Sequence, residues 1–176
     1  LTVKTARVLI DRAPEQAAEP LDYMLSLSQA ALSEMRALIF ELRPETLEKE
    51  GLVEALTRQA EMLQLRYGVK VDAALGDEPG ISLDIKENLY WIAREALHNV
   101  VKHARAARVT MRLTCSGETI TLHVEDDGIG FDTSHPQRGH LGLRSMSERA
   151  ARINGALEIF SQPRRGTRLE VTAPCR

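Results

Sequence analysis

Three short groups of residues between positions 95 and 143 carry side chains that could bind a metal ion and a nucleotide. The first is a polar stripe, the second an Asp-Asp-Gly-Ile-Gly run, and the third a pair of glycines. A carboxamide oxygen suits Mg²⁺, a carboxylate can accept from a base, and glycine-rich backbone can surround phosphates. In chain order the groups are Glu95–His103, Asp126–Gly130 and Gly139–Leu143.

The polar stripe lies in a segment, 84–104, whose apolar spacing predicts a helix. Glu95, Asn99 and His103 recur at every fourth residue, and Lys102 follows Asn99 by three, so the four share one side of that helix. The Asn99 amide oxygen is a hard ligand for Mg²⁺, and Glu95 could accept from a metal-bound water. The two cations could meet phosphate oxygens. A plain solvated helix face is the alternative, and the stripe alone favours it.

Asp126 ends a predicted strand, 119–125, and begins the Asp-Asp-Gly-Ile-Gly run. A carboxylate there could accept from the exocyclic amine of adenine and would discriminate against guanine, which presents a carbonyl at the corresponding position. Gly128 and Gly130 permit close approaches that a side chain would block. A simple strand-ending turn explains the same run equally well.

Gly139 and Gly142 flank His140 and Leu141, and we expect a helix to begin at Leu143. Glycines that lead into a helix N-terminus leave backbone amides free for phosphate. The pair lacks the Lys-Ser/Thr of a P-loop and the glycine spacing of a dinucleotide-binding turn. By itself it indicates a simple loop more strongly than a phosphate site.

The elements that must position these groups follow Gly51. The pattern predicts helices covering one face of a largely antiparallel sheet, which is an α+β fold. The predicted helices span 51–66, 84–104 and 143–153, and the predicted strands 69–73, 107–115, 119–125, 156–161 and 167–173.

The first forty-three residues contain no glycine and have a different pattern. A heptad seam predicts a bundle helix, which ends at Arg43 because a residue before proline avoids the helical region. With a shorter helix at 3–13 it forms a predicted hairpin, whose seam requires a partner, either another copy or more of this polypeptide. We therefore expect two domains, 1–44 and 45–176. The seam residues are Leu21, Leu25, Ser28, Leu32, Met35, Ile39 and Leu42.

Composition limits the possible partners. A net charge of −2 gives no long-range attraction to nucleic acid or to an anionic membrane. No apolar run approaches the roughly 18 residues of a membrane span. Two cysteines do not make a disulfide framework, so we expect a reducing cytoplasm, and Cys115 alternates with apolar residues as a buried strand residue would. The chain begins at Leu1 without methionine, which we interpret as a piece of something longer.

Taken together, the three groups resemble the ATP-binding domain of the histidine kinases. Glu95–His103 corresponds to the N box, Asp126–Gly130 to the first glycine box and Gly139–Leu143 to the second. Gly166-Thr167, with Pro174 seven residues later, resembles the closing G-T motif of that family. The order, the spacing and the placement on elements all agree with the family.

The region before the pocket narrows the resemblance. The run 38–44 ends in Leu-Arg-Pro and is followed by Gly-Leu-Val-Glu-Ala-Leu at 51–56. This is similar to the subfamily that includes the nitrate-responsive and lipid-fluidity sensors, and the likeness covers 21–174. It implies a layered α/β sandwich of the GHKL (Bergerat) type, preceded by a helical hairpin from a dimerisation bundle.

The resemblance implies a role for each matching residue. Asn99 would be the Mg²⁺ ligand and Asp126 the adenine carboxylate, while Glu95 would polarise or position water as the catalytic residue. Lys102 and His103 would approach the phosphates. The segment 133–138 would form a lid, Thr167 would support the pocket floor, and the glycines would shape both. The implied ATP-binding set is completed by Gly128, Gly130, Gly139, His140, Leu141, Gly142 and Leu143.

Two positions depart from the family pattern. Asp127 stands where asparagine is more common, which adds charge beside Asp126. The acceptor histidine of the bundle helix is missing, because no histidine precedes His98. The chain is thus expected to bind Mg-ATP and to donate the γ-phosphate to a histidine upstream of Leu1, for onward transfer to a response regulator receiver domain.

The full protein is expected to be a homodimer, and this piece is expected to make no direct contact with a membrane or nucleic acid. The alternatives are a serine-kinase switch protein that sequesters a sigma factor, and an ATP-gated clamp. Serine-kinase switch proteins lack a hairpin ending in Leu-Arg-Pro, whereas this chain has that motif. ATP-gated clamps differ in carrying a longer lid and a transducer domain. A further alternative is a degenerate pocket that binds nucleotide but catalyses no reaction. The presence of Glu95 and Asn99 argues against it.

Overall fold

The structure is a computed structural model that divides into two compact units, Leu1–Pro44 and Glu45–Arg176. In the first unit, residues 21–25 are helical, and Leu21 and Leu25 of the predicted seam are exposed. The rest of the predicted hairpin lies outside the described residues. The described residues are 18, 21–25, 44–132 and 141–175.

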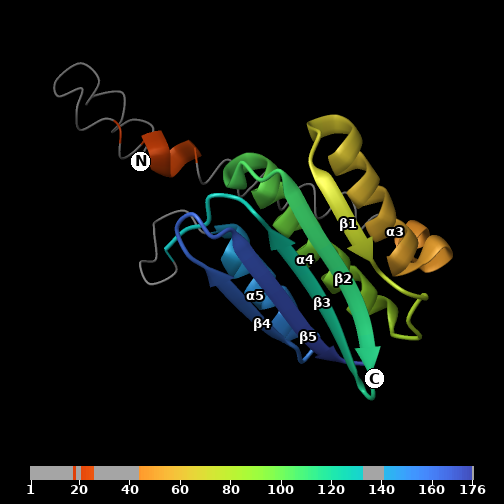
Figure 1. The fold of residues 1–176 in the computed structure, drawn as a ribbon. Coiled ribbons are helices and arrows are strands. Elements are labelled where there is room, and N and C mark those ends of the chain that lie inside the picture. Colours follow the sequence, from red (N-terminus) through yellow and green to blue (C-terminus); the bar gives the residue numbers. More distant parts are fainter. Residues whose placement is uncertain (1–17, 19–20, 26–43, 133–140, 176) are drawn as a thin grey trace. The chain divides into compact units, whose positions relative to one another are not determined.

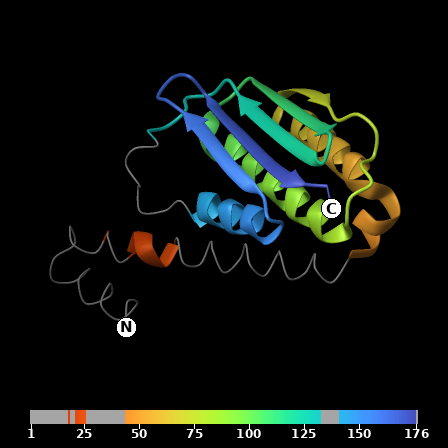
Figure 2. The same cartoon turned by 90° about the horizontal axis from the view of Figure 1, so that it is seen from below.

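The second unit contains a five-stranded sheet and three α-helices (Figure 1). The strand order is β1-β2-β3-β5-β4, with β1 parallel to β2 and the other pairs antiparallel. Figure 2 shows the helices together below the sheet, so the predicted α+β architecture is confirmed. The strands are β1 (Lys70–Ala74), β2 (Arg108–Ser116), β3 (Thr119–Asp126), β4 (Ala156–Ser161) and β5 (Thr167–Pro174). The helices are α3 (Pro44–Tyr67), α4 (Leu83–Asn99) and α5 (Leu141–Arg152).

Alternation along the strands places apolar side chains under the helices. Met111 of β2 pairs with Val124 of β3, which pairs with Leu169 of β5, and all three are buried. Burial of such rows is the main stabilising contribution in a domain of this size. The prediction for Cys115 is wrong: it continues the alternation but is exposed, because it lies at the end of β2 beside the turn.

Helix α3 is broken at Gly51, where φ is 86° and ψ is 170°. The Glu78 carboxylate accepts from the N–H groups of Leu52 (2.9 Å) and Val53 (2.8 Å), which begin the second part of the helix. A β-carbon at position 51 would lie 2.6 Å from this carboxylate, so the break and the cap both require glycine. The sequence predicted a helix only from 51, whereas helical structure begins at Pro44.

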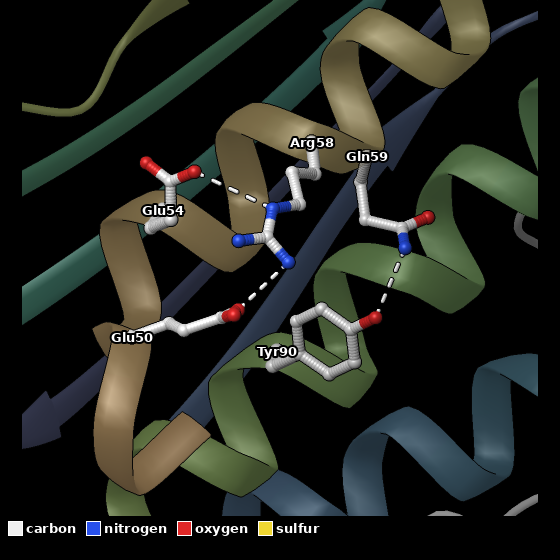
Figure 3. Close-up of polar contacts among 5 residues, drawn as sticks. All are labelled: Glu50, Glu54, Arg58, Gln59 and Tyr90. Atoms are coloured by element: carbon white, nitrogen blue, oxygen red, sulfur yellow. Dashed lines mark hydrogen bonds and ion pairs between the residues drawn. The ribbon is translucent and has the colours of Figure 1, made fainter. Parts of the chain in front are cut away.

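A side-chain hydrogen bond joins α3 to α4 (Figure 3). Gln59 of α3 donates to the Tyr90 hydroxyl of α4 over 2.9 Å. On the same helix Arg58 pairs with Glu50 at 2.7 Å and with Glu54 at 3.4 Å. Both ion pairs lie within α3 and are exposed, so they contribute little to stability, and the Gln59–Tyr90 hydrogen bond is the contact that Figure 3 shows between the two helices.

Helix α4 is followed directly by one turn of π-helix, Val100–Ala104. The sequence predicted a single α-helix over 84–104, and the combined limits agree with it. The wider turn was not predicted, and such turns occur frequently at functional sites. None of the helices in the described part of the chain has the length and apolar character needed to cross a membrane.

Candidate functional site

A cavity of about 440 Å³ lies on the helix-covered side of the sheet. Its wall is formed by α4, the π-turn, α5, and residues of β3, β4 and β5. The structure brings together, in this one cavity, residues from all three sequence groups and from the Gly-Thr motif. The sequence-predicted residues that line it are Asn99, His103, Asp126, Gly130, Gly142, Leu143 and Thr167.

Most of the remaining wall is apolar and was missed by the sequence analysis. Ile129 and Phe131 come from the loop after β3, and Met146 comes from α5. Met146 has the helical spacing of an inward-facing residue, but that signal does not distinguish a cavity wall from a filled core. Ile129 and Phe131 lie in a loop, where no periodic pattern marks them. An apolar wall with few polar groups is the usual composition of a small-molecule site.

Asp126 is the buried carboxylate of the cavity. It ends β3 in register with Thr167, and the N–H of Gly128 donates to its Oδ1 over 2.8 Å. Burial raises the pKa of Asp126 above its ordinary value. The N–H groups of Gly128 and Thr167 oppose this shift, while the neighbouring charges of Asp127 and Glu125 add to it. The site therefore holds an acceptor whose charge is costly without a ligand.

Asp127 has a separate structural task. Its Oδ1 accepts from the N–H groups of Ala107 (2.8 Å) and Arg108 (2.9 Å), at the start of β2. The side chain thereby joins the loop after β3 to the neighbouring strand. An asparagine oxygen could accept the same two bonds, so the departure from the family pattern preserves the geometry and adds a charge.

The polar stripe is divided between cavity and surface. Asn99 ends α4 and His103 lies in the π-turn, and both line the cavity. Lys102 is exposed and is not among the lining residues. The prediction that all four polar groups share one side assumed α-helical spacing, which the wider π-turn after Asn99 does not keep.

Glu95 lies beside the cavity, against the first turn of α5. A β-carbon on Gly142 would collide with the Glu95 carboxylate, so glycine allows α4 and α5 to approach each other here. The predicted helix start at Leu143 is wrong by two residues, because α5 begins at Leu141 and includes Gly142. The amides of this first turn lack partners within the helix, as a phosphate site requires.

The other predicted residues lie elsewhere. Gly128 is buried against Ala104 and outside the cavity lining, and Leu141 is exposed. Gly139, His140 and the predicted lid at 133–138 fall outside the described residues.

Comparison with protein families agrees with the layered fold and its cavity. The profile of the "Histidine kinase-, DNA gyrase B-, and HSP90-like ATPase" family matches residues 84–176, and a second profile, "Histidine kinase", matches residues 1–47. The chain belongs to the first of these families, and the predicted membership of the histidine kinase group is confirmed.

Curated relatives specify the group further. The chain is 33% identical over 176 residues to the sensor histidine kinase LiaS of Bacillus subtilis (strain 168), covering 99% of this chain and 49% of LiaS. It is 34% identical over 159 residues to the sensor protein VraS of Staphylococcus saprophyticus, covering 88% of this chain and 46% of VraS. The chain thus spans about half the length of these relatives.

Solved structures agree on the fold. The histidine kinase domain of the blue-light activated kinase of Erythrobacter litoralis EL346 has a TM-score of 0.61 at 24% identity, covering 70% of this chain and 61% of that chain. The histidine kinase AdeS of Acinetobacter baumannii has a TM-score of 0.62 at 12% identity, covering 99% and 95%. At these identities the likeness concerns the fold alone.

Proposed function

We propose that residues 45–176 bind Mg-ATP in this cavity as the catalytic domain of a sensor histidine kinase. The observation that carries the proposal is the presence of Asn99 and Asp126 in the wall of one cavity, although they come from α4 and β3. The family membership supports ATP as the ligand.

Adenine fits the apolar part of the site around the buried Asp126. Asp126 supplies a buried acceptor, and the exocyclic amine of adenine supplies a donor. A guanine carbonyl would face the same carboxylate without a proton between them. The cavity therefore discriminates between purines by the cost of an unpaired buried group.

Magnesium would be held by Asn99 together with phosphate oxygens and water. Among the described residues no group of three or more His, Cys, Asp or Glu side chains could hold a metal ion. Mg²⁺ typically binds through one or two protein ligands plus substrate phosphates, which fits a single amide oxygen. When bound, the ion would neutralise charge on the phosphates. Glu95, beside the cavity, and His103, in its lining, would position water and phosphate. Lys102 precedes His103 on the exposed side of the π-turn and would approach the phosphates from there.

Residues 1–44 are proposed to belong to the dimerisation bundle, with the phosphoacceptor histidine further upstream. In the transfer, the bond from the γ-phosphorus to the β–γ bridging oxygen breaks, a P–N bond to imidazole forms, and ADP leaves. The protein contributes positioning and charge stabilisation. A cytoplasmic homodimer that passes the phosphoryl group to an aspartate of a response regulator completes the proposal.

Calorimetry with ADP and GDP, with and without Mg²⁺, tests the binding site. We expect ADP to bind more tightly than GDP, and Mg²⁺ to tighten ADP binding. Asn99→Ala is expected to abolish the effect of Mg²⁺ without loss of fold, whereas Asn99→Asp retains an oxygen ligand and most of the effect. An unchanged Mg²⁺ dependence in Asn99→Ala would refute the ligand role.

Labelled ATP tests the transfer. A chain extended upstream by a few tens of residues is expected to take up acid-labile, base-stable label, and the present chain is not. Label on serine or threonine, which is acid-stable, would instead support the serine-kinase switch class.

A further inference from the structure

Ser161, the last residue of β4, joins three parts of the cavity wall through one hydroxyl group. Its Oγ accepts from the N–H of Phe131 over 2.9 Å and donates to the carbonyl of Gly166 over 2.9 Å. The same oxygen lies 3.1 Å from the Thr167 hydroxyl. Phe131 and Thr167 both line the cavity, whereas Ser161 does not.

The number of protons and lone pairs available in this network determines which group donates in each hydrogen bond. A serine hydroxyl has one proton and two acceptor lone pairs. The Gly166 carbonyl can only accept, so it takes the Ser161 proton. The Phe131 N–H occupies one lone pair of Ser161. The Thr167 hydroxyl must then donate to the second lone pair.

We propose that Ser161 is a positioning residue for base specificity, because it consumes the Thr167 proton and leaves Thr167 with only acceptor lone pairs for a ligand. Thr167 is paired in register with Asp126. The two side chains then present acceptors together, and no donor from this pair faces the base. The inference rests on the proposed function and deepens it, since it assigns the preference for an amine-bearing purine to three residues instead of one.

Without the Ser161 hydroxyl, Thr167 is free to rotate and donate. A donor beside Asp126 could bind the carbonyl of guanine, which the intact network excludes. The Phe131 N–H and the Gly166 carbonyl would also lose a partner. The effect on specificity, however, passes through the Thr167 hydroxyl alone, and this separates it from a general loss of structure.

The test measures the ratio of ADP to GDP affinity by calorimetry in the full chain. Ser161→Ala is expected to lower the ratio by about tenfold, the effect of one hydrogen bond. Ser161→Thr retains the hydroxyl and is expected to restore most of the ratio. Ser116→Ala is the matched control, because Ser116 ends β2 beside the hairpin turn and is exposed.

A double-mutant cycle adds a readout that a purely structural role would not move. In a Thr167→Val background no hydroxyl remains to reorient, so Ser161→Ala is expected to leave the ratio unchanged. If Ser161→Ala fails to fold, as judged by circular dichroism, Ser161→Cys is measured in its place, because a thiol is a poor acceptor for the Thr167 proton and is expected to lower the ratio as well. An unaltered ratio in a folded Ser161→Ala or Ser161→Cys overturns the proposal.

The outcomes separate this inference from the function on which it rests. Equal affinities of the wild type for ADP and GDP would overturn the proposed adenine site itself. A selective wild type whose ratio survives Ser161→Ala would overturn only the role of Ser161. A ratio that falls in Ser161→Ala and also falls further in the Thr167→Val background would show a path that does not run through Thr167, and would likewise overturn it.

Discussion

At the residue scale, the chemistry of the cavity depends on a carboxylate placed where its charge is unfavourable. Asp126 is buried, and the charges of Asp127 and Glu125 lie close to it. Two backbone N–H groups offset part of this cost. The balance leaves the pKa raised, so an amine donor from a ligand would relieve an existing instability.

Replacing Asp126 by asparagine is expected to separate stability from binding. The folded-state pKa is raised, so the stability it confers is present below the ordinary value of 3.8 and lost as pH rises through the folded pKa. At neutral pH, Asp126→Asn removes a buried charge and is expected to leave the melting temperature equal or higher. ADP affinity should fall by about 1–3 kcal/mol, because the amide is a poorer acceptor. A lower melting temperature with intact ADP binding would contradict this account.

Asp127→Asn is expected to shift the pH dependence of ADP binding without weakening it at neutral pH. The asparagine oxygen keeps the two bonds to Ala107 and Arg108, while the like charge beside Asp126 disappears. The pKa of Asp126 should then fall, and the decline of ADP affinity in acid should begin at a lower pH. Calorimetry from pH 4 to 8 checks this, with Asp127→Ala, which removes the bonds as well, as the comparison.

At the element scale, the joint between the two parts of α3 depends on Gly51 and Glu78. The carboxylate caps the second part of the helix and pairs with Lys86 at 2.7 Å. Burial raises the pKa of Glu78, but the bonds from Lys86, Val53 and Leu52 outweigh it, and the net pKa is lowered. The cap therefore favours the ionised carboxylate.

Removal of this cap is expected to show a pH-dependent cost. Because the folded-state pKa of Glu78 lies below its ordinary value of 4.5, its contribution is present above that value and lost as pH falls through the folded pKa. The free energy of unfolding of Glu78→Gln should be below that of the wild type at pH 7, and the two should converge in acid. Urea titrations at several pH values measure this, and a constant difference would contradict it.

Gly51→Ala should be destabilising for two reasons that act together. The backbone at position 51 has a positive φ, and the new methyl group would lie 2.6 Å from the Glu78 carboxylate. Such strain costs about 1–3 kcal/mol. Gly68→Ala is a suitable control at thermal unfolding, since that position also has a positive φ but nothing lies within 4 Å of its β-carbon position. A loss at Gly51 no larger than at Gly68 would exclude the contact as a cause.

The elements were largely predictable from the sequence, and the exceptions have physical reasons. Alternation on β2 and β3 gave their limits within a residue or two, since one face is buried. The π-turn after Asn99 has no sequence signature, because its spacing differs from the α-helix only over one turn. Likewise, the sequence alone predicts that Gly142 precedes a helix, whereas it lies in the first turn of α5. The contact with Glu95 explains why this helical position is glycine.

Site residues could be predicted where a motif combined a suitable side chain with a characteristic order and spacing along the sequence. Asn99 and Asp126 could be found in this way, and both line the cavity. Ser161 could not, because a serine at the end of a strand is common and gives no sign of its partners. Gly166 and Thr167 lie just across the β4–β5 hairpin, but Phe131 meets Ser161 from a loop outside the sheet. That tertiary contact joins residues far apart in the chain, and a local sequence pattern does not encode it.

At the scale of the whole molecule, the site belongs to one of two compact units. Every residue that lines the cavity lies between Ala96 and Leu169, within Glu45–Arg176. That unit has its own buried core, from Leu47 on α3 to Ala173 on β5. A unit with its own core is expected to fold alone.

A chain cut to residues 45–176 should therefore fold cooperatively and bind ADP with an affinity within about threefold of the full chain, a difference below 1 kcal/mol. All proposed ligand groups remain, and Leu47, which is fully buried, anchors the new N-terminus. Thermal unfolding and calorimetry on both chains measure this, with Asp126→Asn in the shorter chain as the control for specific binding. A tenfold loss of ADP affinity in a folded 45–176 chain would show that residues 1–44 contribute to the site. An unfolded 45–176 chain would show that the core of the second unit depends on the first.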